Sequence, residues 1–262
     1  MKNRITELFE KKQKDILNVY FTAGYPKLND TVTIIELLEK SGADLIEIGM
    51  PFSDPLADGP TIQASGDIAL NNGMNIKKLF EQLEGIRSKV NIPIVLMGYI
   101  NPVLQYGFEA FCKKAAEVGV DGLILPDLPH MEFKEFYEPH FRSNNLSNIF
   151  LVTPQTSPER LAKIDADSSG FIYVVSTNST TGNEARDTEG MVSYFERIQS
   201  AGLKNPTLIG FNIKDQVSFE RACKYSNGAI IGSAFIKALE ASSDLETTIT
   251  SFVAGIKGEA LV

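Results

Sequence analysis

Residues 45–60 read LIEIGMPFSDPLADGP and hold the most informative pattern in the chain. The apolar, β-branched run at its start predicts a buried strand of a parallel sheet. Glu47 lies inside that run, between Ile46 and Ile48, where a charge is costly unless it is paired or used in chemistry. A loop rich in proline and glycine follows and carries Asp58. We interpret Glu47 and Asp58 as a candidate acid–base pair, with a salt-bridged strand-end glutamate as the alternative.

Similar apolar runs recur along the whole sequence and predict eight strands with helical segments between them. The predicted strands are residues 16–21, 45–49, 94–97, 122–125, 149–152, 171–175, 207–210 and 229–231. This alternation over about 250 residues is typical of a single-domain TIM (β/α)8 barrel, an α/β fold, and a doubly wound open sheet is the alternative. The segment before the first strand predicts an extra N-terminal helix.

Two of the intervals between predicted strands are longer than one βα unit requires. One runs from residue 50 to about residue 73, after the second strand, and the other covers residues 176–189, after the sixth. In a parallel barrel both belong to the face at the carboxyl ends of the strands, where such folds keep their active sites. We therefore expect two extended loops over the site.

Composition narrows the class of protein. The chain has 262 residues, 43% of them hydrophobic and 22% charged, and no linker or low-complexity tract, so we expect one domain over residues 1–262. Its net charge of −8 gives no support for a nucleic-acid or membrane partner. No signal peptide or membrane span is apparent, and Cys112 and Cys223 suit reduced thiols, so we expect a cytoplasmic protein.

The last two predicted strands end in glycine-bearing segments that suit a phosphate group. Gly232 and Ser233 follow the eighth strand and are placed to begin a short helix, whose amides can bind an anion without a cationic side chain. Asn212, after the seventh strand, and Gly182, in the sixth loop, are further candidates. Each glycine alone is weak evidence, but their convergence at neighbouring strand ends predicts a phosphate site.

Five motifs are spread over nearly the whole chain: FTAGYP at residues 21–26, PFSDPLADGP at 51–60, GYINP at 98–102, PDLP at 126–129 and GSA at 232–234. Together they resemble the tryptophan synthase alpha chain family, and the motif at 51–60 is highly specific to it. The resemblance implies a lyase that splits indole-3-glycerol phosphate into indole and glyceraldehyde 3-phosphate by a retro-aldol cleavage.

The resemblance also implies roles for individual residues. The catalytic pair of the family falls on Glu47, expected to donate and accept the proton, and on Asp58, expected to hydrogen-bond the indole N–H. The expected substrate-binding residues are Tyr20, Tyr99, Tyr173 and Thr181. The expected phosphate-binding residues are Gly182, Asn212, Gly232 and Ser233. No metal ligand is expected.

A partner follows from the resemblance as well. It is a beta chain that converts indole to tryptophan with pyridoxal phosphate, in an expected α2β2 heterotetramer. The cofactor belongs to that partner, and none is expected on this chain. Residues 51–55 and 99–102, with parts of the sixth loop, are the expected contacts.

Two positions depart from the usual pattern of the family. Residues 177–179 read TNS where the family usually has Arg-x-Gly, so loop closure and communication with the partner are expected to differ. Asn212 stands where glycine is common, and asparagine tolerates the left-handed backbone that glycine supplies.

Other functions of such a barrel fit the sequence less well. A Schiff-base aldolase needs a buried lysine on a strand, and none of the predicted strands contains one. A metal aldolase needs clustered histidines, and the chain has only His130 and His140. A phosphosugar isomerase shares the phosphate end, but the motif at 51–60 argues against it. The non-enzymatic alternative is a regulatory subunit whose own activity is weakened by residues 177–179.

Overall fold

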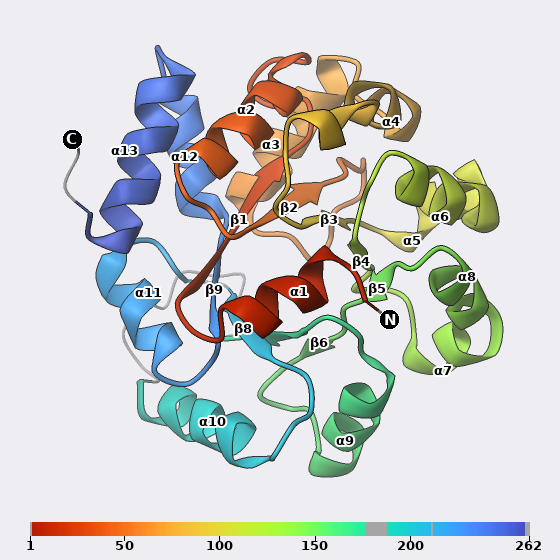
Figure 1. The fold of residues 1–262 in the computed structure, drawn as a ribbon, viewed down its shortest axis with the longest axis vertical. Helices are drawn as coiled ribbons and strands as arrows, with labels where there is room; N and C mark the ends of the chain where they lie inside the picture. Colours follow the sequence, from red (N-terminus) through yellow and green to blue (C-terminus); the bar gives the residue numbers. More distant parts are fainter. Residues whose placement is uncertain (1, 177–187, 211, 260–262) are drawn as a thin grey trace.

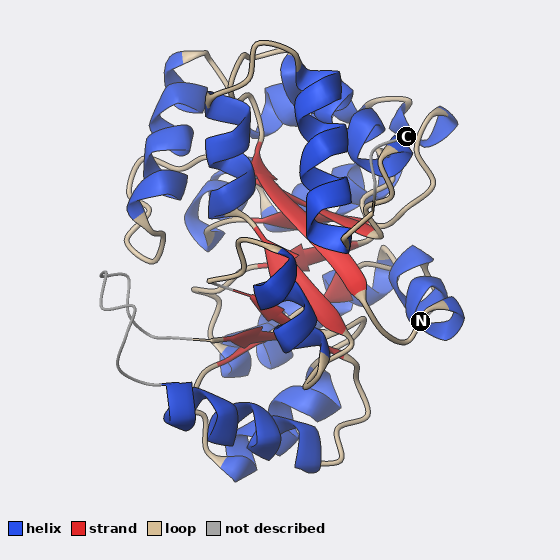
Figure 2. Ribbon diagram, turned by 90° about the vertical axis from the view of Figure 1, so that its left-hand side faces the viewer, coloured by secondary structure: helices blue, strands red, loops and turns tan. Residues whose placement is uncertain are grey.

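The computed structural model describes residues 2–176, 188–210 and 212–259, in which a curled parallel sheet is surrounded by helices (Figure 1). In the view turned by 90° the strands run diagonally between helices on both sides (Figure 2). The described strands are β1 (Ile16–Thr22), β2 (Leu45–Gly49), β3 (Ile94–Met97), β4 (Gly122–Ile124), β5 (Ser147–Asn148), β6 (Leu151–Val152), β7 (Ile172–Val175), β8 (Thr207–Gly210) and β9 (Gly228–Ile231).

Helices occupy the intervals between the strands. The first group is α1 (Arg4–Lys11), α2 (Asp30–Lys40), α3 (Pro60–Asn71), α4 (Ile76–Leu83), the 3-10 turn η1 (Ile86–Ser88), α5 (Ile100–Tyr106) and α6 (Phe108–Glu117). The second is α7 (His130–Glu132), the π-helical η2 (Phe133–Tyr137), α8 (Glu138–Ser143), α9 (Pro158–Asp167), α10 (Thr188–Ser200), α11 (Gln216–Cys223), α12 (Ser233–Glu240) and α13 (Leu245–Lys257).

The single strand predicted at residues 149–152 is wrong in detail. The sheet order is β5-β4-β3-β2-β1-β9-β8-β7-β6. Strand β5 ends at Asn148, just before the predicted segment, and only the last two residues of the segment form a strand, β6, at the opposite edge. The backbone N–H of Ile149 donates to the Leu123 oxygen at 3.1 Å, while the oxygen of Phe150 accepts from the Tyr173 N–H at 2.9 Å. Consecutive residues therefore bond to opposite edges, and the chain passes from one edge of the curled sheet to the other.

The long loop predicted from residue 50 to about residue 73 is also wrong in extent. A helix, α3, fills its second half, because Pro60 suits a first helical position and Ser65 and Ala69 bury one face. The Ser65 hydroxyl lies 2.6 Å from that of Thr22, which ties α3 to the end of β1. The other predicted loop, residues 176–189, lies mostly outside the described residues.

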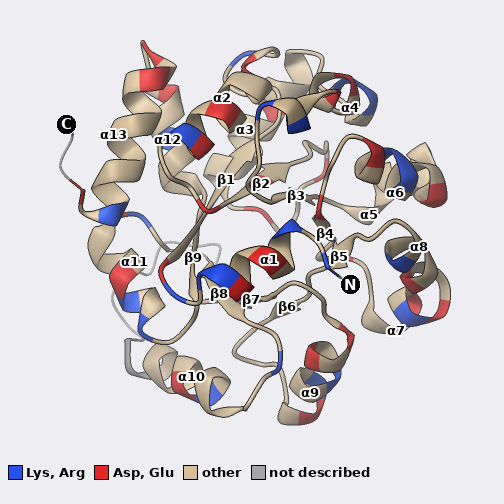
Figure 3. Ribbon diagram, in the orientation of Figure 1, with Lys and Arg blue, Asp and Glu red and all other residues tan. Residues whose placement is uncertain are grey.

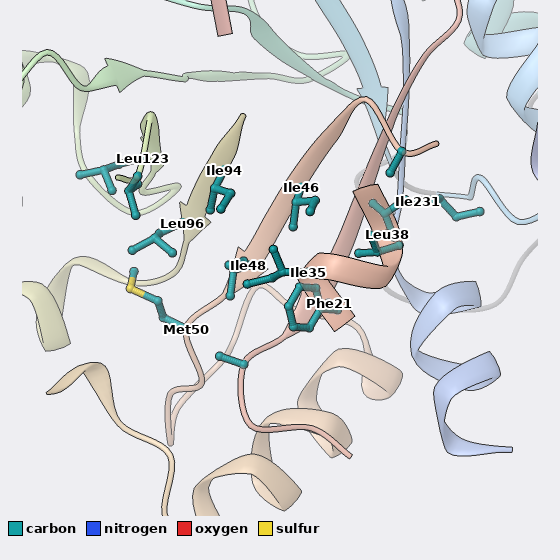
Figure 4. Packing of buried hydrophobic residues seen from close by; sticks show 14 of the residues in the cluster. Phe21, Ile35, Leu38, Ile46, Ile48, Met50, Ile94, Leu96, Leu123 and Ile231 are labelled. Carbon is teal, nitrogen blue, oxygen red and sulfur yellow. The ribbon is translucent and has the colours of Figure 1, made fainter. Parts of the chain in front are cut away.

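The strands are apolar on both faces, as a parallel sheet covered on both sides requires. Alternate residues, among them Leu45, Val95 and Leu208, point into the curl of the sheet and form an inner cluster. The residues between them point outward to the helices: Ile35 of α2 lies beside Ile48 of β2 in the outer cluster (Figure 4). Burying each such side chain contributes about 1.5–3 kcal/mol.

Helix α1 covers the amino-terminal side of the inner cluster, in front of the strands in Figure 1. Its Ile5 is fully buried there, and the Phe9 ring lies 6.1 Å from that of Phe171. The Asn3 side chain caps the helix and also donates to the Asp121 oxygen at 2.9 Å. With this side covered, a ligand can enter the curl of the sheet only past the carboxyl ends of the strands.

The surface of the molecule carries most of its charge. Lysine, arginine, aspartate and glutamate lie mainly on the surrounding helices and their connections (Figure 3). Over the described ranges, none of the helices has the length and apolar character needed to span a membrane. Three acidic side chains are buried among the described residues: Glu47, Asp121 and Asp165. Asp121 forms ion pairs with Arg4 and Arg87, whereas Glu47 is 1% exposed and lies on a strand.

Candidate active site

Glu47 lies on the inner face of β2, where the parallel register sets it opposite Tyr20 of β1. The Asn18 side chain, one inward position earlier on β1, donates from Nδ2 to Glu47 Oε2 at 2.9 Å. Among the described residues, the other oxygen of the carboxyl group, Oε1, has no hydrogen-bond partner. The predicted alternative, a salt-bridged glutamate, is not what these residues show, because the group that donates to the carboxyl is a neutral amide.

Burial determines the charge of this carboxyl group. The loss of hydration raises the pKa of Glu47 to about 8, and the hydrogen bond from Asn18 offsets the rise only in part. Glu47 is therefore mostly protonated at neutral pH. A carboxylic acid that keeps its proton at neutral pH can act as a general acid, and after donating the proton it becomes a base.

Each of two tyrosine rings covers a glycine at the carboxyl end of the strand next to its own. A Cβ atom on Gly49 would lie 2.1 Å from the Tyr20 hydroxyl, and one on Gly210 would lie 2.2 Å from the Tyr173 hydroxyl. Both tyrosines have a raised pKa, first through burial and then through the nearby acids Asp58 and Glu47. Tyr20 and Tyr173 therefore remain neutral phenols beside Glu47.

Gly49→Ala is expected to lower the free energy of unfolding by about 1–3 kcal/mol, since the new methyl group forces the Tyr20 ring out of its place. Chemical denaturation measures the change. The control is Gly255→Ala in α13, where an added Cβ meets no atom within 4 Å. An equal loss in both variants, or none in Gly49→Ala, would show that the Tyr20–Gly49 contact does not constrain the site.

Asp58 reaches the site from the loop between β2 and α3. The Tyr99 hydroxyl donates to Asp58 Oδ2 at 3.1 Å and accepts from the Ala57 N–H at 3.0 Å. The Phe52 ring lies 5.2 Å from the ring of Tyr99 and packs the loop against it. Burial raises the pKa of Asp58, whereas the Tyr99 hydrogen bond favours its ionised form. Tyr99 thus couples the start of α5 to the loop that carries Asp58.

The predicted phosphate residues are only partly within the described structure. Gly232 and Ser233 begin α12 as the sequence predicts, at the end of β9. Asn212 has a φ of 57°, the left-handed conformation that its substitution for glycine anticipates. Gly182 and Thr181, like residues 177–179, lie outside the described residues. The structure therefore brings Gly232, Ser233 and Asn212 to adjacent strand ends, and phosphate binding stays a prediction.

Three residues of the site escaped the sequence analysis. Gly49 and Gly210 are strand-end glycines whose need for glycine appears only when the tyrosines are in place. Asn18 carried a clearer signal, because it is the one polar residue between Ile16 and Phe21 in an otherwise apolar run. A buried amide in such a strand requires a partner, and Glu47 is that partner.

The described residues do not supply the groups that a Schiff-base aldolase or a metal aldolase requires. None of the nine described strands contains a lysine that could form a Schiff base. The two histidines lie on α7 and α8, where His130 binds Asp167 at 2.7 Å and His140 contacts Phe108. Over the described ranges, His, Cys, Asp and Glu form no group of three that could hold a metal ion.

Comparisons with known proteins identify the family to which this chain belongs. A family model for the tryptophan synthase alpha chain matches residues 7–259. The alpha chain of Flavobacterium johnsoniae is 58% identical over 92% of this chain and 94% of its own length. The alpha chain of Flavobacterium psychrophilum is 55% identical over 97% of this chain and 99% of its own length. The crystal structure of tryptophan synthase subunit alpha from Legionella pneumophila superposes with a TM-score of 0.89, 32% identity and 98% of both chains covered. This chain belongs to the tryptophan synthase alpha chain family.

Proposed function

We propose that this protein cleaves indole-3-glycerol phosphate to indole and glyceraldehyde 3-phosphate, as a carbon–carbon lyase of tryptophan biosynthesis. Membership of the tryptophan synthase alpha chain family supports the reaction. The observation that carries the proposal is Glu47, a buried carboxyl whose raised pKa of about 8 keeps it protonated at neutral pH. Its position inside the curled sheet, below the loop of Asp58, matches a reaction that needs one acid and one anion.

The proposed steps use these two groups in turn. Glu47 donates its proton to C3 of the indole ring, which leaves a positive charge on the ring nitrogen. Asp58 accepts a hydrogen bond from the ring N–H and stabilises that charge. Glu47, now a carboxylate, takes the proton from the carbinol hydroxyl as the carbon–carbon bond breaks. The electrons of that bond return to the ring, so indole leaves neutral and the side chain becomes an aldehyde.

The remaining contacts hold the substrate in place. Tyr20 and Tyr173 lie beside Glu47 and are placed to contact the indole and its side chain. Tyr99 reaches the substrate through Asp58. The α12 amides at Gly232 and Ser233, together with Asn212, are placed for the phosphate. On family resemblance alone, we assign Thr181 of the sixth loop to substrate binding and Gly182 of that loop to phosphate binding.

We infer that the curled sheet closes as a (β/α)8 barrel within a single domain. The support is the bonding of Ile149 to β4 and of Phe150 to β7, which links the two sheet edges through consecutive residues. Helix α1 is then the extra element below the barrel, and the loops after β2 and β7 are the extended loops above it. The reaction as proposed needs no metal or cofactor on this chain.

We further propose that a beta chain docks on the rim formed by the ends of β2, β3 and β4. Three large apolar side chains stand exposed after these adjacent strands: Leu56 at 91%, Leu104 at 44% and Met131 at 80%. Apolar groups gathered in this way suit a protein partner. An α2β2 heterotetramer, with pyridoxal phosphate on the beta chain, would receive indole at this face. The expected location of the assembly is the cytoplasm.

Asp58→Asn is expected to lower kcat/KM for indole release by about 10²-fold, because an amide keeps the shape but cannot stabilise the charge on the ring nitrogen. The assay uses the isolated chain with indole-3-glycerol phosphate. Asp54→Asn is the matched control, since Asp54 lies exposed in the same loop and its carboxylate accepts a hydrogen bond from the neighbouring Ser53 hydroxyl. Equal activities in the two variants would remove Asp58 from the mechanism, and absence of release by the unaltered chain would favour a regulatory subunit.

A further inference from the structure

Two buried oxygen atoms at the centre of the site have no hydrogen-bond partner within residues 2–176, 188–210 and 212–259: Asn18 Oδ1 and Glu47 Oε1. They belong to side chains that already share a bond, from Asn18 Nδ2 to Glu47 Oε2 at 2.9 Å. Asn18 is fully buried and Glu47 is 1% exposed, so neither side chain is exposed to bulk water. An unpaired buried polar atom lowers the free energy of unfolding, and both unpaired oxygens here belong to one pair of residues in contact.

Both atoms accept hydrogen bonds when the carboxyl group is ionised, and two acceptors cannot pair. A carboxylic acid is different, because its O–H is a donor while its second oxygen still accepts. An amide and an acid can then exchange two hydrogen bonds in one planar ring. The bond from Asn18 Nδ2 to Glu47 Oε2 forms half of that ring. Rotation of the amide and carboxyl planes about this bond brings Asn18 Oδ1 and Glu47 Oε1 together.

We propose that Asn18 and protonated Glu47 form a two-bond amide–acid pair, in which Glu47 Oε1–H donates to Asn18 Oδ1 while Asn18 Nδ2 donates to Glu47 Oε2. The pair leaves neither buried oxygen unpaired. Asn18 is thus a positioning residue that holds the proton of Glu47 on a defined oxygen. This inference rests on the proposed role of Glu47 as the proton donor.

A purely structural role explains Asn18 less well. The backbones of β1 and β2 are already paired from Asn18 opposite Leu45 to Thr22 opposite Gly49, so no side-chain bond is needed to set their register. Apart from Glu47 and Tyr20, Asn18 has apolar neighbours on the same inner face, namely Ile16, Leu45 and Ile230. A leucine would fill this place without burying an amide, so the position of the amide follows from the chemistry of Glu47.

The pair also suits the proton transfer. When substrate enters, the hydrogen bond from Asn18 Nδ2 to Glu47 Oε2 can persist. The Oε1–H group of Glu47 then leaves Asn18 Oδ1 and points to C3 of the indole ring. The carboxyl group then needs only a small rotation to present its proton. Among the described residues, Tyr20 of β1 and Tyr173 of β7 interact electrostatically with Glu47 and are neutral phenols, and Asp58, in the loop after β2, acts on both tyrosines.

The test combines infrared spectroscopy with steady-state kinetics on the full chain. At pH 6, below the Glu47 pKa of about 8, subtracting the spectrum of Glu47→Gln isolates the C=O band of the protonated acid. In Asn18→Leu the band is expected at higher wavenumber, because both hydrogen bonds to the acid are lost. The kcat for indole release is expected to fall about 10- to 100-fold with little change in KM, since the acid is misplaced while substrate binding remains.

Asn148→Leu is the matched control, since Asn148 is also a buried strand asparagine with an unpaired amide nitrogen but faces the outer helices. It should change neither the band nor kcat. If Asn18→Leu does not fold, Asn18→Ala takes its place. An unmoved band and an unchanged kcat in the Asn18 variant would overturn the pairing and leave the proposed function standing. No acid band from Glu47 at pH 6 would instead overturn the proposed proton donor itself.

Discussion

Glu47→Gln is expected to reduce indole release by at least about 10³-fold while the protein stays folded. Glutamine has the shape of the protonated acid but no proton to give and no basic oxygen to take one back. Both proton transfers of the proposed mechanism are lost together. The fold is expected to survive, because the glutamine amide can pair with Asn18 as the acid does and carries no charge into the interior.

Steady-state assays of the isolated chain measure this loss, with circular dichroism as the check on folding. The neighbouring tyrosine offers a matched control: Tyr20→Phe removes only a hydroxyl from the same site and is expected to cost far less. Residual activity of Glu47→Gln within about tenfold of the unaltered chain would assign the proton transfers to another group.

The second large effect is on stability as a function of pH. The pKa of Glu47 is about 8 in the folded protein against an ordinary value of 4.5, so the folded state binds the proton more tightly. A raised folded pKa stabilises the protein fully below about pH 4.5, and that stability is lost as the pH rises through about 8. At about 1.4 kcal/mol per pH unit between these two values, the loss is on the order of 5 kcal/mol.

Glu47→Gln removes this titration and leaves every other group in place. The free energy of unfolding of the unaltered protein minus that of the variant should therefore fall from pH 5 to about pH 8 and level off above it. Chemical denaturation at a series of pH values measures the difference, in which the contributions of other groups cancel. A difference that stays constant with pH would mean that Glu47 is ionised in the folded protein.

Local patterns predicted most of the strands correctly. Seven of the predicted strands correspond to single strands of the structure, because each is a short β-branched run that parallel pairing can bury on both faces. The strand at 149–152 failed because its two ends bond to different neighbours, which is a property of sheet curvature and not of local composition. Helix α3 was missed because Pro and Gly around residues 55–60 read as loop, although Pro60 is well placed as a first helical residue.

The site could be predicted where chemistry conflicts with local pattern. A glutamate inside an apolar strand stands out in the sequence, and its neighbour Asn18 carried the same signal without being recognised. The Tyr99–Asp58 hydrogen bond joins residues 41 positions apart, and the Tyr20–Gly49 contact likewise exists only in three dimensions. The raised pKa of Glu47 follows from complete burial, which no local window of sequence determines.

The decisive measurement is the structure of this chain with a substrate analogue that lacks the carbinol hydroxyl. We expect a Glu47 oxygen about 3–3.5 Å from C3 of the indole ring, with an Asp58 oxygen on the ring N–H. An indole bound with both Glu47 oxygens out of reach of C3, and with its N–H bonded to some group other than Asp58, would contradict the mechanism.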